Sequence, residues 1–148
     1  MALVTDEDSL PSITRPDQLA FCRVMANLIA TDHKVTEEER KNFIGLVMDM
    51  GLSPFDPDVT GILDKEIASP TPIAELAKSI THPGMRRTLY RSALEVALCD
   101  GLAPEEEKKL TELAVLFQLN PTAAKELMRW TMDSIAMEKR EQDIMSRL

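Results

Sequence analysis

Helix-start signals recur along the whole sequence, and they constrain the fold more than any other feature. A residue that caps helices is followed by proline at Asp56-Pro57, Thr71-Pro72 and Asn120-Pro121. The capping side chain accepts a hydrogen bond from an amide of the first turn, and proline fits there because that position needs no donor. Apolar residues with helical spacing follow each start, and no alternating strand pattern or Asn-Gly hairpin signal occurs. The sequence therefore predicts an all-α fold.

We predict a compact bundle of about seven helices in one domain over residues 14–148, after a flexible leader over residues 1–13. The expected helices cover residues 17–30, 37–50, 56–68, 71–80, 83–98 and 104–117, and a long last helix starts at residue 121. The helix over 17–30 is apolar on more than one face, so we expect it at the centre. Cys22 and Cys99 lie in apolar helical runs, where we expect reduced core thiols.

The helix over residues 37–50 has the clearest boundaries. Thr36 and Glu39 have the spacing of a capping box, in which each side chain accepts from the other residue's backbone amide. Gly51 follows the last turn, at a position where left-handed backbone is common. We expect the buried stripe to consist of Phe43, Ile44, Leu46, Val47 and Met50.

The second and sixth helices form an approximate internal repeat. The segment ATDHKVTEEE, from Ala30, resembles LCDGLAPEEE, from Leu98, at an offset of 68 residues. Past the loop an offset of 67 fits better and aligns Phe43 with Leu110 and Leu52 with Leu119. The repeat predicts two helix-loop-helix units related by a pseudo-twofold axis, with their acidic loops near each other.

These residues resemble the TerB-like (tellurite-resistance) family over residues 17–135. The shared features are an apolar helix, an Asp-Gly type of loop, a glutamate-rich helix start and an ending such as Met50-Gly51-Leu52-Ser53. The sequence departs from the family at His33, where the family usually has glycine, whereas the second copy keeps Gly101. The resemblance implies a compact cytoplasmic protein of a bacterial stress or envelope-associated system. It also implies a non-enzymatic role, metal-ion binding, and association with partner proteins or the inner face of the membrane.

The two acidic loops are candidate sites for a divalent cation, Ca²⁺ or Mg²⁺. The candidate ligands are Asp32 and Glu38 in the first loop, and Asp100 and Glu106 in the second. Several carboxylates are needed because one neutralises only part of a divalent charge. Glutamates in a first helical turn also complement the helix dipole, so helix-start chemistry is the alternative explanation. A cation-binding sensor or buffer is therefore our second functional hypothesis.

Two further features are candidate partner-binding surfaces. Arg86, Arg87 and Arg91 lie close together on one helix, in a stretch from Lys78 to Ser92 without acidic residues. They could dock an acidic partner or a phosphate head group. The last helix carries Trp130 and Met137, with Ile144 at the same spacing of seven. We expect its first half to pack Trp130 into the core and the residues beyond Met137 to protrude or form an oligomer contact.

Charge and missing motifs exclude several function classes. The formal net charge is -8, which disfavours nucleic-acid binding. No phosphate-binding loop, nucleophile elbow or HExxH motif occurs, so we expect no enzyme activity. No signal peptide or membrane-spanning run is present, which favours the cytoplasm. We predict a non-catalytic interaction or adaptor protein with a protein partner; peripheral membrane association and a homodimer stay open.

Overall fold

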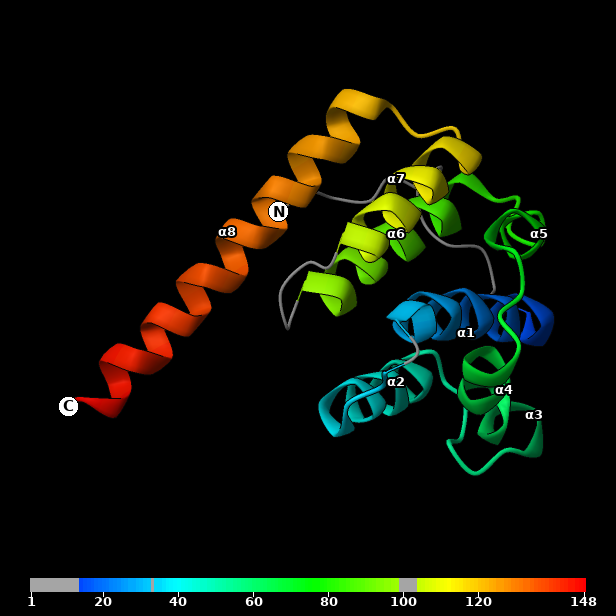
Figure 1. The fold of residues 1–148 in the computed structure, drawn as a ribbon, viewed down its shortest axis with the longest axis horizontal. Coiled ribbons are helices and arrows are strands. Elements are labelled where there is room, and N and C mark those ends of the chain that lie inside the picture. The colour runs from blue at the N-terminus through cyan, green and yellow to red at the C-terminus, as the bar shows by residue number, and fades with distance from the viewer. Residues whose placement is uncertain (1–13, 33, 99–103) are drawn as a thin grey trace.

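The structure, a computed structural model, describes residues 14–32, 34–98 and 104–148 (Figure 1). These residues form eight α-helices and one 3-10 helix without any strand, which confirms the all-α prediction. The elements are α1 (Arg15–Ile29), η1 (Ala30–Asp32), α2 (Glu37–Asp49), α3 (Pro57–Thr60), α4 (Ile62–Ala68), α5 (Ile73–Ala77), α6 (Pro83–Leu98), α7 (Pro104–Leu116) and α8 (Pro121–Ser146). The predicted leader, His33 and the loop 99–103 lie outside the described residues.

α1 is the central helix of the bundle, as its sequence predicts. A capping box starts the helix, because the Thr14 hydroxyl accepts from the Asp17 amide while the Asp17 carboxylate accepts from the Thr14 amide. Nine of its fifteen residues are buried. It contacts α2, α4, α5 and α6, and Figure 1 shows α2 to α4 on one side of it and α6 and α7 on the other. These neighbours cover a helix that is apolar on several faces.

Cys22 is a buried thiol in the middle of α1, as the sequence predicts. Burial raises the pKa of this thiol to about 11, because the thiolate loses its hydration in the core. The thiol is therefore protonated and unreactive near neutral pH. The second cysteine, Cys99, lies outside the described residues.

α2 and α7 end in the same way, which supports the internal repeat. Each helix has 13 residues, and each is followed by a residue with positive φ, Gly51 at 85° and Gln118 at 56°. After α2 the amide of Leu52 donates to the carbonyl of Val47 at 3.1 Å. After α7 the amide of Leu119 donates to the carbonyl of Ala114 at 3.0 Å. Both endings are Schellman motifs, at positions separated by the predicted offset of 67.

Three predictions about the first half of the chain are wrong in detail. The helix expected over 71–80 is α5, which covers only Ile73–Ala77 and has Pro72 rather than Thr71 as its N-cap residue. The segment expected as one helix over 56–68 forms α3 and α4, because Gly61 ends the first and precedes the second. Glycine is a weak helix former, and here it separates two short helices. Ile44 is 45% exposed rather than buried. Phe43 and Val47 face the core, and Ile44 lies about 100° further round α2.

α8 is the longest helix, with 26 residues, and only its first half packs on the bundle. It contacts α6 and α7, and its buried residues are Ala124 and Thr131. The residues that pack partly buried against the core are Leu127, Met128 and Ile135. All residues from 136 to 148 are exposed, and Figure 1 shows this end of α8 extending past the other helices. Among the described helices, none combines the length and the apolar character needed to cross a bilayer.

Candidate functional site on the C-terminal helix

One apolar face of α8 is not covered by the rest of the described structure. Trp130, Met137 and Ile144 are 58%, 73% and 44% exposed. Residues seven apart are separated by about two helical turns, so these three side chains follow one line along the helix. Met145 and Leu148, also exposed, lie beyond Ile144 at the C-terminal end, with Met145 about 100° round the helix from Ile144. We call these five residues the α8 face.

The prediction that Trp130 packs into the core is wrong. The next residue, Thr131, is the one that is buried, and its hydroxyl donates to the carbonyl of Leu127 at 2.8 Å. Consecutive residues lie about 100° apart around a helix, so Trp130 lies to one side of the buried Thr131, at the edge of the contact between α8 and the bundle. The prediction that the chain protrudes beyond Met137 is confirmed, since every residue after it is exposed.

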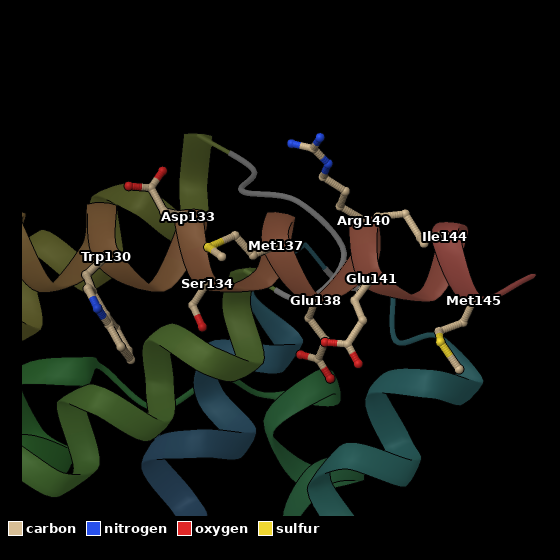
Figure 2. Close-up of a pocket in the computed structure, with 9 residues that line it drawn as sticks. All are labelled: Trp130, Asp133, Ser134, Met137, Glu138, Arg140, Glu141, Ile144 and Met145. Atoms are coloured by element: carbon tan, nitrogen blue, oxygen red, sulfur yellow. The ribbon is translucent and has the colours of Figure 1, made fainter. Parts of the chain in front are cut away.

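Polar side chains flank the α8 face on both sides. Figure 2 shows Asp133 and Arg140 projecting from one side of the helix and Ser134 and Glu141 from the other, with Met137 between them. All residues that line this shallow surface belong to α8. The face therefore offers a central apolar strip with charges of both signs at its edges. This composition is suited to binding another protein, because apolar contacts provide affinity and the charges at the edges determine how the two partners align.

A groove of about 510 Å³ lies between α8 and the bundle. Glu38 of α2 and Arg91 of α6 line its bundle side, and Trp130 lies on its α8 side. The Arg91 Nε atom lies 3.6 Å from the carboxylate of Glu95, which also lines the groove. The structure therefore brings together three candidates that the sequence placed in separate sites: Glu38, Arg91 and Trp130.

The predicted arginine cluster is divided between different surroundings. Arg86 is half-buried, and its Nε atom donates to the carbonyl of Ile80 at 2.8 Å. Its guanidinium lies 5.6 Å from the centre of the Phe117 ring, a cation–π distance. Arg87 is exposed, and Arg91 lines the groove beside α8. Arg86 thus links the start of α6 to the end of α7, whereas Arg91 is available at the groove.

Residues 12–130 match the model of a family described as "Protein of unknown function (DUF533)". The chain belongs to the DUF533 family. No curated protein and no solved structure matches the chain. The DUF533 match ends at Trp130, within α8. Met137 and the rest of the α8 face therefore lie beyond the matched residues.

The predicted metal ligands of this DUF533 protein are only partly described. The side chain of Asp32 and all of Asp100 lie outside the described residues. Glu38 is exposed in the first turn of α2, and Glu106 is half-buried in the first turn of α7. In the described residues no group of three or more His, Cys, Asp or Glu side chains could hold a metal ion. The Ca²⁺ or Mg²⁺ site stays a prediction, and calorimetric titration of the Asp32→Ala/Asp100→Ala variant tests it.

The DUF533 core contains a buried polar cluster that the sequence analysis missed. Asn27 of α1 donates from Nδ2 to Oε1 of Glu66 in α4 at 2.8 Å. Thr71 donates to the same carboxylate twice, from its amide at 3.0 Å and from its hydroxyl at 2.8 Å. The ammonium of Lys65 lies 3.1 Å from Oε2 of Glu66, and that of Lys109 donates to Oδ1 of Asn27 at 3.1 Å. The cluster joins α1, α4 and α7.

Hydrogen bonds keep Glu66 charged inside the core. Burial alone would raise the pKa of Glu66, but the hydrogen bonds from Asn27, Thr71 and Lys65 together lower it below the usual value. Burial lowers the pKa of Lys109 although Glu66 and Glu112 attract its charge. Among the described residues, no buried side-chain nitrogen or oxygen lacks a hydrogen-bond partner. A fully satisfied cluster of this kind fixes the packing of the helices.

A signal for Glu66 was present in the sequence. Val59, Ile62, Leu63 and Glu66 follow the spacing of one buried helix face, so Glu66 is a charged residue at a core position. A buried charge needs partners, which predicts a polar group opposite it. Asn27, between Ala26 and Leu28 on the apolar central helix, is that group.

Proposed function

We propose that this DUF533 protein is a non-catalytic interaction protein whose α8 face binds a protein partner. The observation that carries the proposal is the exposure of Trp130, Met137 and Ile144 along a helix that extends past the bundle. Burying one large apolar side chain contributes about 1.5–3 kcal/mol, so leaving several exposed along one face is unfavourable in water. Aligned apolar residues with a polar rim are typical of interaction sites.

The second half of α8 also needs external support as a helix. Residues 136–146 are helical and all of them are exposed. A helix shorter than about 12–15 residues is marginal in water without tertiary contacts. A partner that covers the α8 face would supply the missing contacts. Methionine side chains adapt to a partner surface, and Trp is enriched where partners contact each other.

The groove beside α8 extends this surface to the acidic start of α2. Glu38 and Arg91, which carry charges of opposite sign, lie across the groove from Trp130. Charged groups at the edge of an apolar contact favour the correct partner and register more than they add affinity. We therefore assign the acidic helix start and α8 to one binding region, with Glu38, Arg91, Trp130 and Met137 as its principal residues.

The wider biological setting is proposed from the family. We propose that this DUF533 protein is related to the TerB-like family, and the resemblance of the repeat and of the helix ending after Met50 supports this relation. The resemblance implies non-enzymatic proteins of bacterial stress or envelope-associated systems. We propose that this chain acts in such a system, in the cytoplasm, and that its partner belongs to the same system.

Co-purification with a matched pair of variants tests the proposal. The Trp130→Ala/Met137→Ala variant shortens the α8 face, and Met48→Ala/Val115→Ala removes two exposed apolar side chains elsewhere. Met48 and Val115 are 58% and 69% exposed, so each variant removes two exposed apolar side chains. We expect the first variant to lose a partner that the second variant retains. The same partner, once purified, should bind the wild-type chain again. Retention of every partner by both variants would reject the α8 face as the binding surface.

A further inference from the structure

The pattern of residues along α8 is complementary to itself when two copies of the helix run in opposite directions. Trp130 lies seven residues before Met137, and Ile144 lies seven residues after it. We propose that the α8 face binds the α8 face of a second copy of this chain, antiparallel, with the twofold axis at Met137. This inference rests on the proposed function and names the partner of that same surface.

The antiparallel register matches large side chains with each other. With Met137 of each copy on the axis, Trp130 of one copy lies level with Ile144 of the other, and beside Met145 of the other. The two Trp130 side chains therefore sit at opposite ends of the contact, each against aliphatic or thioether groups. Sulfur–aromatic contacts of this kind are favourable. Each copy places its last two turns along the first half of the other copy's α8.

The edge charges of two copies are complementary when the helices run antiparallel. Asp133 and Arg140 lie on the same side of α8, on either side of Met137 (Figure 2). Neither side chain forms an ion pair with another described residue. In an antiparallel pair, residues on the same side of the two helices face each other, so Asp133 of each copy meets Arg140 of the other. A parallel pair would instead bring the side of one helix that carries Asp133 and Arg140 to the side of the other that carries Ser134 and Glu141.

The opposite edge is also complementary. Ser134 and Glu141 lie on the other side of α8 (Figure 2), and the same register places Ser134 of one copy beside Glu141 of the other. A serine hydroxyl can donate a hydrogen bond to a carboxylate, so these polar residues at the edge of the α8 face gain partners.

The position of α8 leaves room for a second helix. The bundle contacts α8 through its buried residues Ala124 and Thr131, which lie on a different side of the helix from Trp130 and Met137. The last turns of the second copy would approach Trp130 next to the groove that Glu38 and Arg91 line. The residues that α8 buries all precede Met137, so the two bundles pack on the helix pair on opposite sides of the twofold axis.

Cross-linking with single cysteines distinguishes the direction of the pair. In the proposed register Met137→Cys faces itself across the axis, whereas two Met145→Cys positions lie about 24 Å apart along the helices, at 1.5 Å per residue. We expect a short bis-maleimide to join Met137→Cys into a species of twice 16.6 kDa and to leave Met145→Cys unjoined. The wild-type chain, which keeps Cys22 and Cys99, is the control for the native thiols. Equal cross-linking of both variants would indicate a parallel pair and overturn the proposal.

The second experiment exchanges the edge charges in the full chain. Sedimentation equilibrium over a concentration series measures the dissociation constant of the dimer. Asp133→Arg alone places like charges opposite each other, and we expect the dissociation constant to rise at least tenfold. The double variant Asp133→Arg/Arg140→Asp restores opposite charges and should recover the dimer. A wild-type chain that stays monomeric at every concentration overturns the second copy as partner. The proposed function would survive that result if Trp130→Ala/Met137→Ala still loses a different protein partner.

Discussion

The side-chain amide of Asn27 donates to the Oε1 atom of Glu66 at 2.8 Å, although each residue is only 1% exposed. The bond connects the central helix α1 to α4. Because the carboxylate also accepts from Thr71 and Lys65, it is the acceptor on which the whole cluster depends. Removing one member of a buried cluster leaves the others without partners, which costs more than the bond itself contributes.

We therefore expect Glu66→Ala to lower the free energy of unfolding by about 3 kcal/mol. Asp64→Ala is the matched control, because Asp64 belongs to the same helix and its side chain is 69% exposed in an ion pair with Arg40. That surface pair should contribute less than about 1 kcal/mol. Urea denaturation of both variants measures the difference. Equal, small losses would show that the cluster does not stabilise the core as described.

The same carboxylate predicts a pH dependence. The folded state lowers the pKa of Glu66, so the unfolded chain binds a proton more readily than the folded one. The stabilisation from Glu66 is complete above the usual glutamate pKa of about 4.3 and is lost as the pH falls through the lower, folded value. We expect the wild type to lose stability on acidification below about pH 4.5 more steeply than Glu66→Gln. Parallel pH profiles of the two proteins would contradict this assignment.

Substitutions at Gly45, Gly51 and Gln118 should change stability in different directions, according to the backbone conformation at each position. Gly51 has a φ of 85°, so Gly51→Ala should cost about 1–2 kcal/mol of stability. Gly45 lies inside α2 with nothing within 4 Å of an added Cβ, and Gly45→Ala should stabilise the helix by about 0.5–1 kcal/mol. Gln118, at 56°, should gain roughly 1 kcal/mol on substitution by glycine. Thermal unfolding of the three variants measures whether each one is stabilised or destabilised. A destabilised Gln118→Gly would contradict the left-handed backbone at the end of α7.

Truncation after Ala136 should leave the bundle intact. The deleted residues are all exposed, whereas Ala124 and Thr131, which α8 buries, are retained. We expect a loss of less than about 1 kcal/mol, which corresponds to a melting temperature within a few degrees of the full chain. Calorimetry of the dilute, monomeric proteins checks this expectation. A loss of cooperative unfolding would show that the end of α8 belongs to the core.

Local signals in the sequence account for most of the fold. The capping box of Thr36 and Glu39 fixed the start of α2, and Pro83 and Pro104 marked the first residues of α6 and α7. Such signals act between residues three or four positions apart, so they can be recognised without tertiary information. The break at Gly61 was missed because a single glycine inside a helical pattern is often tolerated.

The candidate site depended on tertiary relations that spacing alone does not determine. The stripe of Trp130, Met137 and Ile144 was visible, but two opposite sides of α8 had apolar residues and either could face the bundle. Burial of Thr131 decided which side does. The groove that joins Glu38, Arg91 and Trp130 was not visible either, because these residues are far apart in the chain and meet only where α2, α6 and α8 approach.

Site-specific photo-cross-linking in cells tests the central claim, that the α8 face binds a partner, most directly. A photoreactive amino acid is placed at Met137 in one protein and at Met48 in another, because both are exposed methionines but only Met137 belongs to the α8 face. We expect a discrete adduct from position 137 and none from position 48, with twice the mass of the chain if the partner is a second copy. No adduct from position 137, or the same adducts from both positions, would contradict it.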